Sequence, residues 1–129
     1  MKIFSESFTL SEIDPDGKAF DEVSRGVFVS EGCRMLMDYH TGLFTHKKMD
    51  RVNVAIFSDE DNFSEKDIPE KYSYLMGNGV IYKTEIKDRT KTVDISFSGL
   101  LVRMEMDPAR MKETQRYKRL FLGVEDALG

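Results

Sequence analysis

The chain has 129 residues, 40% of them hydrophobic and 11% aromatic, a composition that supports a single folded domain over residues 1–129 and excludes a disordered chain. Its net charge of −4 at pH 7 excludes a generally basic nucleic-acid or membrane-surface protein. The charge is uneven, because residues 1–70 carry 8 basic and 15 acidic side chains, whereas residues 71–129 carry 11 and 8. Any contact with an anionic partner should therefore be local.

The sequence also predicts a cellular compartment. No segment approaches the roughly 20 apolar residues of a membrane span, and Glu6 stands where a signal peptide would be apolar. A single cysteine, Cys33, cannot form an internal disulfide and suits a reducing compartment. We expect a protein that works inside the cell without contact to a membrane.

Alternation of apolar and polar side chains predicts about eight β-strands. In chain order they fall within residues 4–13, 23–30, 33–38, 52–57, 80–86, 93–97, 100–106 and 117–122. Asp14–Gly17 has the sequence of a type I turn, and Ser30–Gly32 and Lys87–Thr90 are short loops, so neighbouring strands should pair antiparallel. Gly77 and Gly79 indicate a bulge or a sharp turn.

Two connecting segments interrupt this pattern. Residues 58–70 hold six acidic side chains and one basic one, which predicts a solvated, mobile loop. Residues 107–116 offer at most a short helical turn, with Pro108 in an allowed first-turn position. Many short strands without a crossover helix predict an all-β antiparallel barrel or sandwich, and closure of a barrel would remove exposed strand edges.

The residues offer little for catalysis or cofactor binding. Cys33, His40 and His46 lack the close spacing of zinc ligands, and the acidic pairs around Asp59 and Asp61 lack the glycine of a calcium loop. Ser98-Gly99 is not a nucleophile elbow, and the sequence has neither a dinucleotide fingerprint nor a Walker motif. We expect no metal, no cofactor and no active site.

Nucleic-acid binding is an open alternative, because small barrels can stack bases on aromatic side chains. The candidates for weak, unspecific binding of a single strand are Lys18, Phe20, Arg25, Phe28 and Arg34. Acidic residues surround them, and phosphate affinity depends on local positive charge. The competing interpretation is that these side chains lie in the core or in ion pairs.

Several stretches resemble one known family. They are FTLSEIDPDGK at Phe8–Lys18, FDEVSR at Phe20–Arg25, YSYLM at Tyr72–Met76, VIYK at Val80–Lys83 and SFSGLLVRM at Ser96–Met104. In this order they resemble the RPABC3 family, the small subunits shared by eukaryotic RNA polymerases I, II and III. The chain differs from the family pattern at Ser98, usually glycine, at Val102, usually methionine, by an extra residue around Asn78, and by a shorter loop at 58–70.

This resemblance implies both a fold and a role. The fold would be an eight-stranded antiparallel barrel related to the oligonucleotide-binding fold. The role would be that of a non-catalytic subunit in the nucleus, docked on the largest polymerase subunit and in contact with other polymerase subunits, with the Mg²⁺ and nucleotide chemistry in the largest subunits.

The strand at 100–106 predicts an interface. Alternation directs Leu100, Val102 and Met104 toward the core and Leu101 and Arg103 to the opposite face, where a leucine is a plausible anchor for a partner. Alternatively, Leu101 packs under a loop of its own chain while Arg103 pairs with an acidic neighbour, Asp94 or Glu105. Two tyrosines of the resembling strand, Tyr74 and Tyr82, are further interface candidates.

Overall fold

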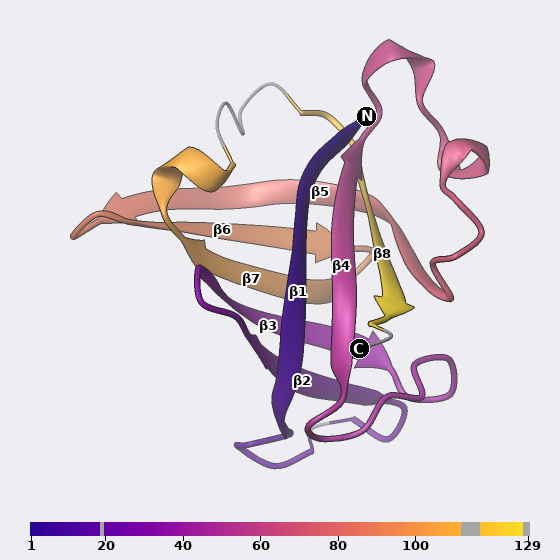
Figure 1. Ribbon diagram of the computed structural model, residues 1–129, viewed down its shortest axis with the longest axis vertical. Coiled ribbons are helices and arrows are strands. Elements are labelled where there is room, and N and C mark those ends of the chain that lie inside the picture. The colour runs from indigo at the N-terminus through magenta and orange to yellow at the C-terminus, as the bar shows by residue number, and fades with distance from the viewer. Residues whose placement is uncertain (19, 112–116, 128–129) are drawn as a thin grey trace.

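A computed structural model describes residues 1–18, 20–111 and 117–127, and these residues form a closed barrel of eight antiparallel strands (Figure 1). The strands are β1 (Lys2–Ile13), β2 (Val23–Val29), β3 (Cys33–His40), β4 (Arg51–Ser58), β5 (Tyr74–Lys87), β6 (Thr90–Phe97), β7 (Leu100–Met106) and β8 (Leu120–Asp126). Around the barrel their order is β1-β2-β3-β7-β6-β5-β8-β4. The prediction of an all-β, eight-stranded antiparallel barrel is confirmed.

The core is built from the inward face of each strand. In β7 the side chains of Val102, Met104 and Met106 are buried, while Leu101 and Arg103 point outward, so the predicted alternation is confirmed. The largest side chains of the interior that are fully buried are Phe8, Phe28, Phe97, Leu10, Met35, Met37, Ile56, Ile95, Met104, Met111, Leu120 and Leu122. Their burial removes most of the apolar surface from water and holds the barrel closed.

Strand β5 differs from its predicted bounds. It begins at Tyr74 rather than near Val80, because the glycine-rich stretch is a bulge inside the strand: its register with β8 shifts between Met76 and Gly79. Gly79 faces the ring of Phe97 so closely that a Cβ atom would collide with it. The glycine therefore allows β5 to run past the core aromatic without a break.

Two-residue hairpin turns connect β5 to β6 and β6 to β7. Asp88 and Arg89 connect β5 to β6 with φ of 51° and 66°, and Ser98 and Gly99 connect β6 to β7 with φ of 54° and 97°. Positive φ at both central residues is the geometry of a type I′ turn, whose twist matches that of paired strands. These turns place β5, β6 and β7 side by side, as predicted for antiparallel neighbours.

The segment between β4 and β5 packs against the outside of the barrel. It contains two short 3₁₀ turns, Glu60–Asn62 and Glu65–Asp67, and most of its charged side chains are exposed. Ile68 is nevertheless buried and Phe63 half-buried, in a cluster with Phe57 and Tyr72. The prediction of a loop that is solvated throughout is therefore wrong at these two apolar positions, and its mobility stays a prediction.

The segment after β7 begins with a single 3₁₀ turn, Pro108–Arg110, which is capped by Asp107: the Asp107 carboxylate accepts a hydrogen bond of 2.8 Å from the Ala109 N–H. The predicted short helical turn is confirmed there, and residues 112–116 of that prediction lie outside the described residues. The buried Lys91 ammonium donates to the Met111 carbonyl at 2.7 Å and anchors the segment. Within the described ranges, no helix is long and apolar enough to cross a membrane.

Candidate interaction surface

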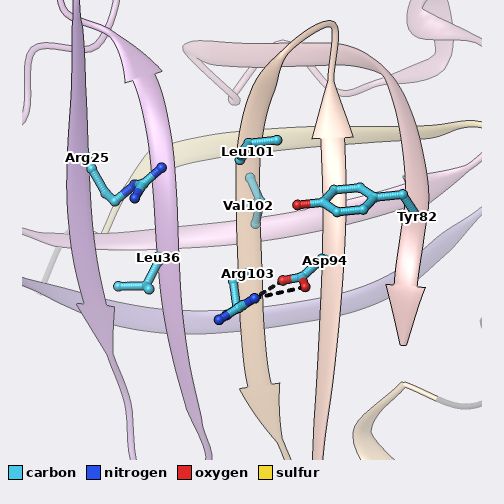
Figure 2. A pocket seen from close by; sticks show the side chains of 7 residues that line it. All are labelled: Arg25, Leu36, Tyr82, Asp94, Leu101, Val102 and Arg103. Carbon is cyan, nitrogen blue, oxygen red and sulfur yellow. Dashed lines mark hydrogen bonds and ion pairs between the residues drawn. The ribbon is translucent and has the colours of Figure 1, made fainter. Parts of the chain in front are cut away.

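Outward side chains of five neighbouring strands meet in a shallow hollow of about 190 Å³ (Figure 2). The strands are β2, β3, β7, β6 and β5, which lie next to one another in the barrel wall. The side chains that form the hollow are Arg25, Leu36, Tyr82, Asp94, Leu101 and Arg103. Residues distant in sequence thus come together because β3 pairs with β7.

The register of the strands fixes this arrangement. Leu36 of β3 lies opposite Arg103 of β7, and Arg103 lies opposite Asp94 of β6. On the far side, Arg25 of β2 lies opposite Asp38 of β3. The Leu101 N–H donates to Asp38 Oδ2 at 3.1 Å, which ties β7 to β3 at the point where their ladder ends.

Two aspartate–arginine pairs form the polar part of the hollow. Arg103 donates through Nε and Nη2 to the two Asp94 oxygens at 2.7 and 3.1 Å, and Arg25 donates in the same way to Asp38 at 2.7 and 3.3 Å. These hydrogen bonds are the main reason why the pKa of each arginine is raised. The side chains of Asp94 and Asp38 are 3% and 12% exposed, whereas those of Arg103 and Arg25 are 50% and 49% exposed. The carboxylates lie underneath and the guanidinium groups face solvent.

Exposed apolar side chains lie next to these pairs. Leu101 is 39% and Tyr82 is 56% exposed, although both are large and hydrophobic. Figure 2 shows the Tyr82 ring reaching from β5 across β6 toward β7, where Leu101 and Arg103 lie. The hollow therefore combines exposed apolar surface with exposed positive charge.

Three of the four predicted interface residues, Leu101, Arg103 and Tyr82, meet in this hollow. Tyr74 is a correction: it is buried, packs on Phe44, and its hydroxyl oxygen accepts the His40 N–H at 3.1 Å. Tyr74 and Met76 are two residues apart and face the same side of β5, so alternation with the apolar Met76 could have placed the Tyr74 side chain in the core. The alternative interpretation is confirmed in one part, since Arg103 pairs with Asp94.

Sequence reasoning missed Leu36 as part of this surface. Its neighbours Met35 and Met37 are buried in the core, while Leu36 is on the outer face of β3. Alternation within 33–38 could have placed Leu36 outward, but the pairing of β3 with β7, which places it opposite Arg103, has no local signal.

The nucleic-acid candidates do not form one groove. Phe28 is a correction, because it is fully buried in the core and cannot stack on a base. Arg34 pairs with Glu105 at 3.1 Å, and Arg25 pairs with Asp38. Phe20 is exposed beside the acidic turn at Asp14–Gly17, and Lys18 lies 3.4 Å from the Ser24 hydroxyl. The ion-paired and core interpretation thus holds for Arg25, Arg34 and Phe28.

The remaining chemistry-bearing side chains are engaged in the fold. Burial raises the pKa of the Cys33 thiol to about 12, so it stays protonated and unreactive near neutral pH. His46 lies 3.2 Å from Asp126, and His40 lies 3.9 Å from Glu22, at separate places. Over residues 1–18, 20–111 and 117–127, no three His, Cys, Asp or Glu side chains gather in a way that could hold a metal ion.

Comparison with known proteins gives a consistent result. Residues 5–125 match the family model described as RNA polymerase Rpb8. The chain is 32% identical to "DNA-directed RNA polymerases I, II, and III subunit rpabc3" of Dictyostelium discoideum, over 97% of each chain. It is 31% identical to "DNA-directed RNA polymerases II, IV and V subunit 8B" of Arabidopsis thaliana, over 93% of this chain and 92% of the relative. A third relative, a "Probable DNA-directed RNA polymerases I, II, and III subunit RPABC3" of Caenorhabditis elegans, is 31% identical over 80% of this chain and 81% of its own.

Proposed function

Because the chain belongs to the RNA polymerase Rpb8 family, we propose that it is a structural, non-catalytic subunit of the DNA-directed RNA polymerases I, II and III. The observation that carries the proposal is the match over nearly the whole length of both chains to a subunit shared by these three enzymes. A match of that extent covers the entire barrel, so it is the whole domain and not one motif that is shared.

The chain works, on this proposal, by docking on the largest polymerase subunit, with contacts to other subunits, in the nucleus. The hollow formed by Arg25, Leu36, Tyr82, Leu101 and Arg103 is the docking surface that we favour. Exposed large hydrophobic side chains are stabilised when a partner covers them, and arginine and tyrosine are frequent anchors of protein interfaces. The polar groups of the hollow are held in ion pairs, which suits a preformed binding surface better than a site that transfers protons.

The experiment is affinity purification of the tagged chain from its own cells, followed by gel filtration and mass spectrometry. We expect the large polymerase subunits to coelute with the chain in near-equal amount. Lysine cross-linking of the purified assembly should then connect Lys83, beside the hollow, to the largest subunit. Recovery of the chain alone, or with no polymerase subunit, contradicts the function; cross-links only to small subunits contradict the docking partner.

A second candidate, weak binding of single-stranded nucleic acid, receives less support. Of its five candidate residues, Phe28 is in the core and both arginines have acidic partners. Lys18 and Phe20 alone offer too little positive charge to retain a phosphate backbone at physiological salt.

A further inference from the structure

The hollow on β2, β3, β7, β6 and β5 has an electrostatic asymmetry that its formal charge hides. Arg25, Arg103 and Asp94 line the hollow, and Asp38, the partner of Arg25, lies next to it, so the four charges cancel; the aspartates, however, lie beneath the surface and the guanidinium groups lie at it. Each guanidinium gives its Nε and one Nη to an aspartate and carries further N–H donors on its half-exposed side. An approaching molecule therefore meets positive donors before it meets a carboxylate.

Both ends of the hollow carry a half-exposed arginine, Arg25 on β2 and Arg103 on β7. Lys83 of β5 lies opposite Asp94, in the same cross-strand row as Arg103 and Leu36; its side chain is exposed and lies 4.0 Å from the Glu85 carboxylate. Each arginine has one further acidic neighbour, Asp16 for Arg25 and Glu105 for Arg103. We favour Arg103 as the partner of an incoming anion because it lies next to the exposed apolar side chains of Leu101 and Tyr82.

The size and lining of the hollow restrict what can bind. Its volume of about 190 Å³ is below the roughly 300 Å³ at which pockets for small organic ligands begin, so it suits individual side chains of a larger partner. Leu36, Leu101 and the Tyr82 ring supply an apolar floor next to Arg103. A phosphate backbone could satisfy Arg103 but offers no aliphatic group for the two leucines.

We propose that this hollow binds an acidic and apolar segment of a partner polypeptide, with a carboxylate on Arg103 and a neighbouring apolar side chain against Leu101 and Tyr82. The inference rests on the proposed function, which supplies the partner as a polymerase subunit, and adds the chemistry of the segment that is recognised. The buried Asp94 holds the Arg103 fork in place before the partner arrives, so little side-chain freedom is lost on binding.

The test places a negative or a positive charge at one exposed position of the hollow, Leu101. Leu101→Glu and Leu101→Lys remove the same leucine and differ in the sign of the new charge. Both variants lose the apolar contact of Leu101, and like charges facing each other across an interface repel, so Leu101→Glu should lower recovery of the large polymerase subunits at least about tenfold more than Leu101→Lys does. Leu43→Glu and Leu43→Lys, at an exposed leucine outside the hollow, are the matched controls and should recover the subunits like wild type.

Other outcomes overturn the inference and separate it from the function. Equal recovery with both Leu101 variants, equal loss with both, or a larger loss with Leu101→Lys excludes an acidic segment while the function stands. Failure of the wild-type chain to recover any polymerase subunit removes the function and this inference with it. Should Leu101→Glu not fold, as judged by its thermal transition, Tyr82→Glu and Tyr82→Lys give the same charge comparison.

A photo-reactive residue in place of Tyr82 identifies the segment directly. We expect the cross-linked peptide to come from a polymerase subunit and to hold Asp or Glu beside an aliphatic or aromatic residue. Cross-linking to nucleic acid, or to a segment whose charged residues are Lys and Arg, overturns the inference.

Discussion

Two parts of the outer barrel wall differ in how their apolar side chains are covered. On β4 and β8, Ala55, Phe57 and Phe121 lie beneath the segment that connects β4 to β5. On β5 and β7, Tyr82 and Leu101 are exposed to solvent. Both faces thus carry large apolar side chains on the outside of the barrel. The first face is covered by Phe63, Ile68 and Tyr72 of the same chain. The fold therefore supplies its own cover where it has a long connection, whereas the face bounded by two-residue turns leaves Tyr82 and Leu101 exposed.

The covered face should contribute far more to stability than the open one. Phe57 is stacked on Phe63 with ring centroids 5.3 Å apart and meets Tyr72 edge to face at 5.6 Å. Phe57→Ala should therefore lower the free energy of unfolding by about 3–4 kcal/mol. Leu101→Ala should lower it by no more than about 1 kcal/mol, because the leucine is already partly in water. Urea unfolding followed by circular dichroism measures both, and equal losses would contradict the comparison.

The open face nevertheless has one stabilising element, the pair of Arg103 with the nearly buried Asp94. Arg103→Ala leaves that carboxylate without its partner and should cost about 3 kcal/mol. For the same reason we expect Arg103→Glu to destabilise the free domain, which makes it unsuitable as a test of docking. Arg34→Ala, which breaks an exposed pair with Glu105, should cost less than about 1 kcal/mol.

A double variant separates loss of the pair from loss of packing. Arg103→Ala combined with Asp94→Ala removes both charges, so the combined cost should be smaller than the cost of Arg103→Ala alone. Additive costs would indicate that Arg103 stabilises the barrel through its aliphatic stem and not through Asp94.

Much of this architecture could be predicted from the sequence, because side-chain alternation in a strand is a local signal. The period of two identified eight strands and placed Leu101 and Arg103 on one face. It does not tell which face is inward where apolar residues are continuous, as in Val27-Phe28-Val29, so the sequence leaves both a core position and base stacking open for Phe28. Tyr74 is an interface candidate only through the resembling stretch Tyr72–Met76, and the resemblance does not tell which face of the strand its side chain takes.

The hollow itself could not be predicted, for a different physical reason. It depends on the pairing of β3 with β7, which joins residues 65 to 73 positions apart and is decided by closure of the whole barrel. Arg25 and Leu101 were therefore assigned to separate candidate functions, although the two side chains line one surface.

The segment that covers the first face should matter for stability even though it is acidic. Sequence reasoning alone predicts that shortening residues 59–65 costs little, because charged loops bury little. The contact of Phe63 with Phe57 and Phe121 changes that expectation, and we expect Phe63→Ala to cost about 1–2 kcal/mol. Deletion of 59–65 should cost a similar amount, and Lys66→Ala, at an exposed position of the same segment, should be neutral. A neutral Phe63→Ala would mean that the outer cluster does not depend on this cover.

The smallest expected effect is the affinity of the open face for single-stranded nucleic acid. The two half-exposed guanidinium groups could each neutralise one phosphate. The affinity for a single strand falls with salt in proportion to the number of neutralised phosphates. The slope of log affinity against log salt should therefore be no steeper than about −1.4. With a net charge of −4 opposing the approach, the dissociation constant near physiological salt should be weaker than about 10 μM. Fluorescence anisotropy with a labelled oligonucleotide between low and high salt measures both quantities. Sub-micromolar binding that persists at high salt would show that bases are stacked or read directly, and would move the open face from a protein interface to a nucleic-acid interface.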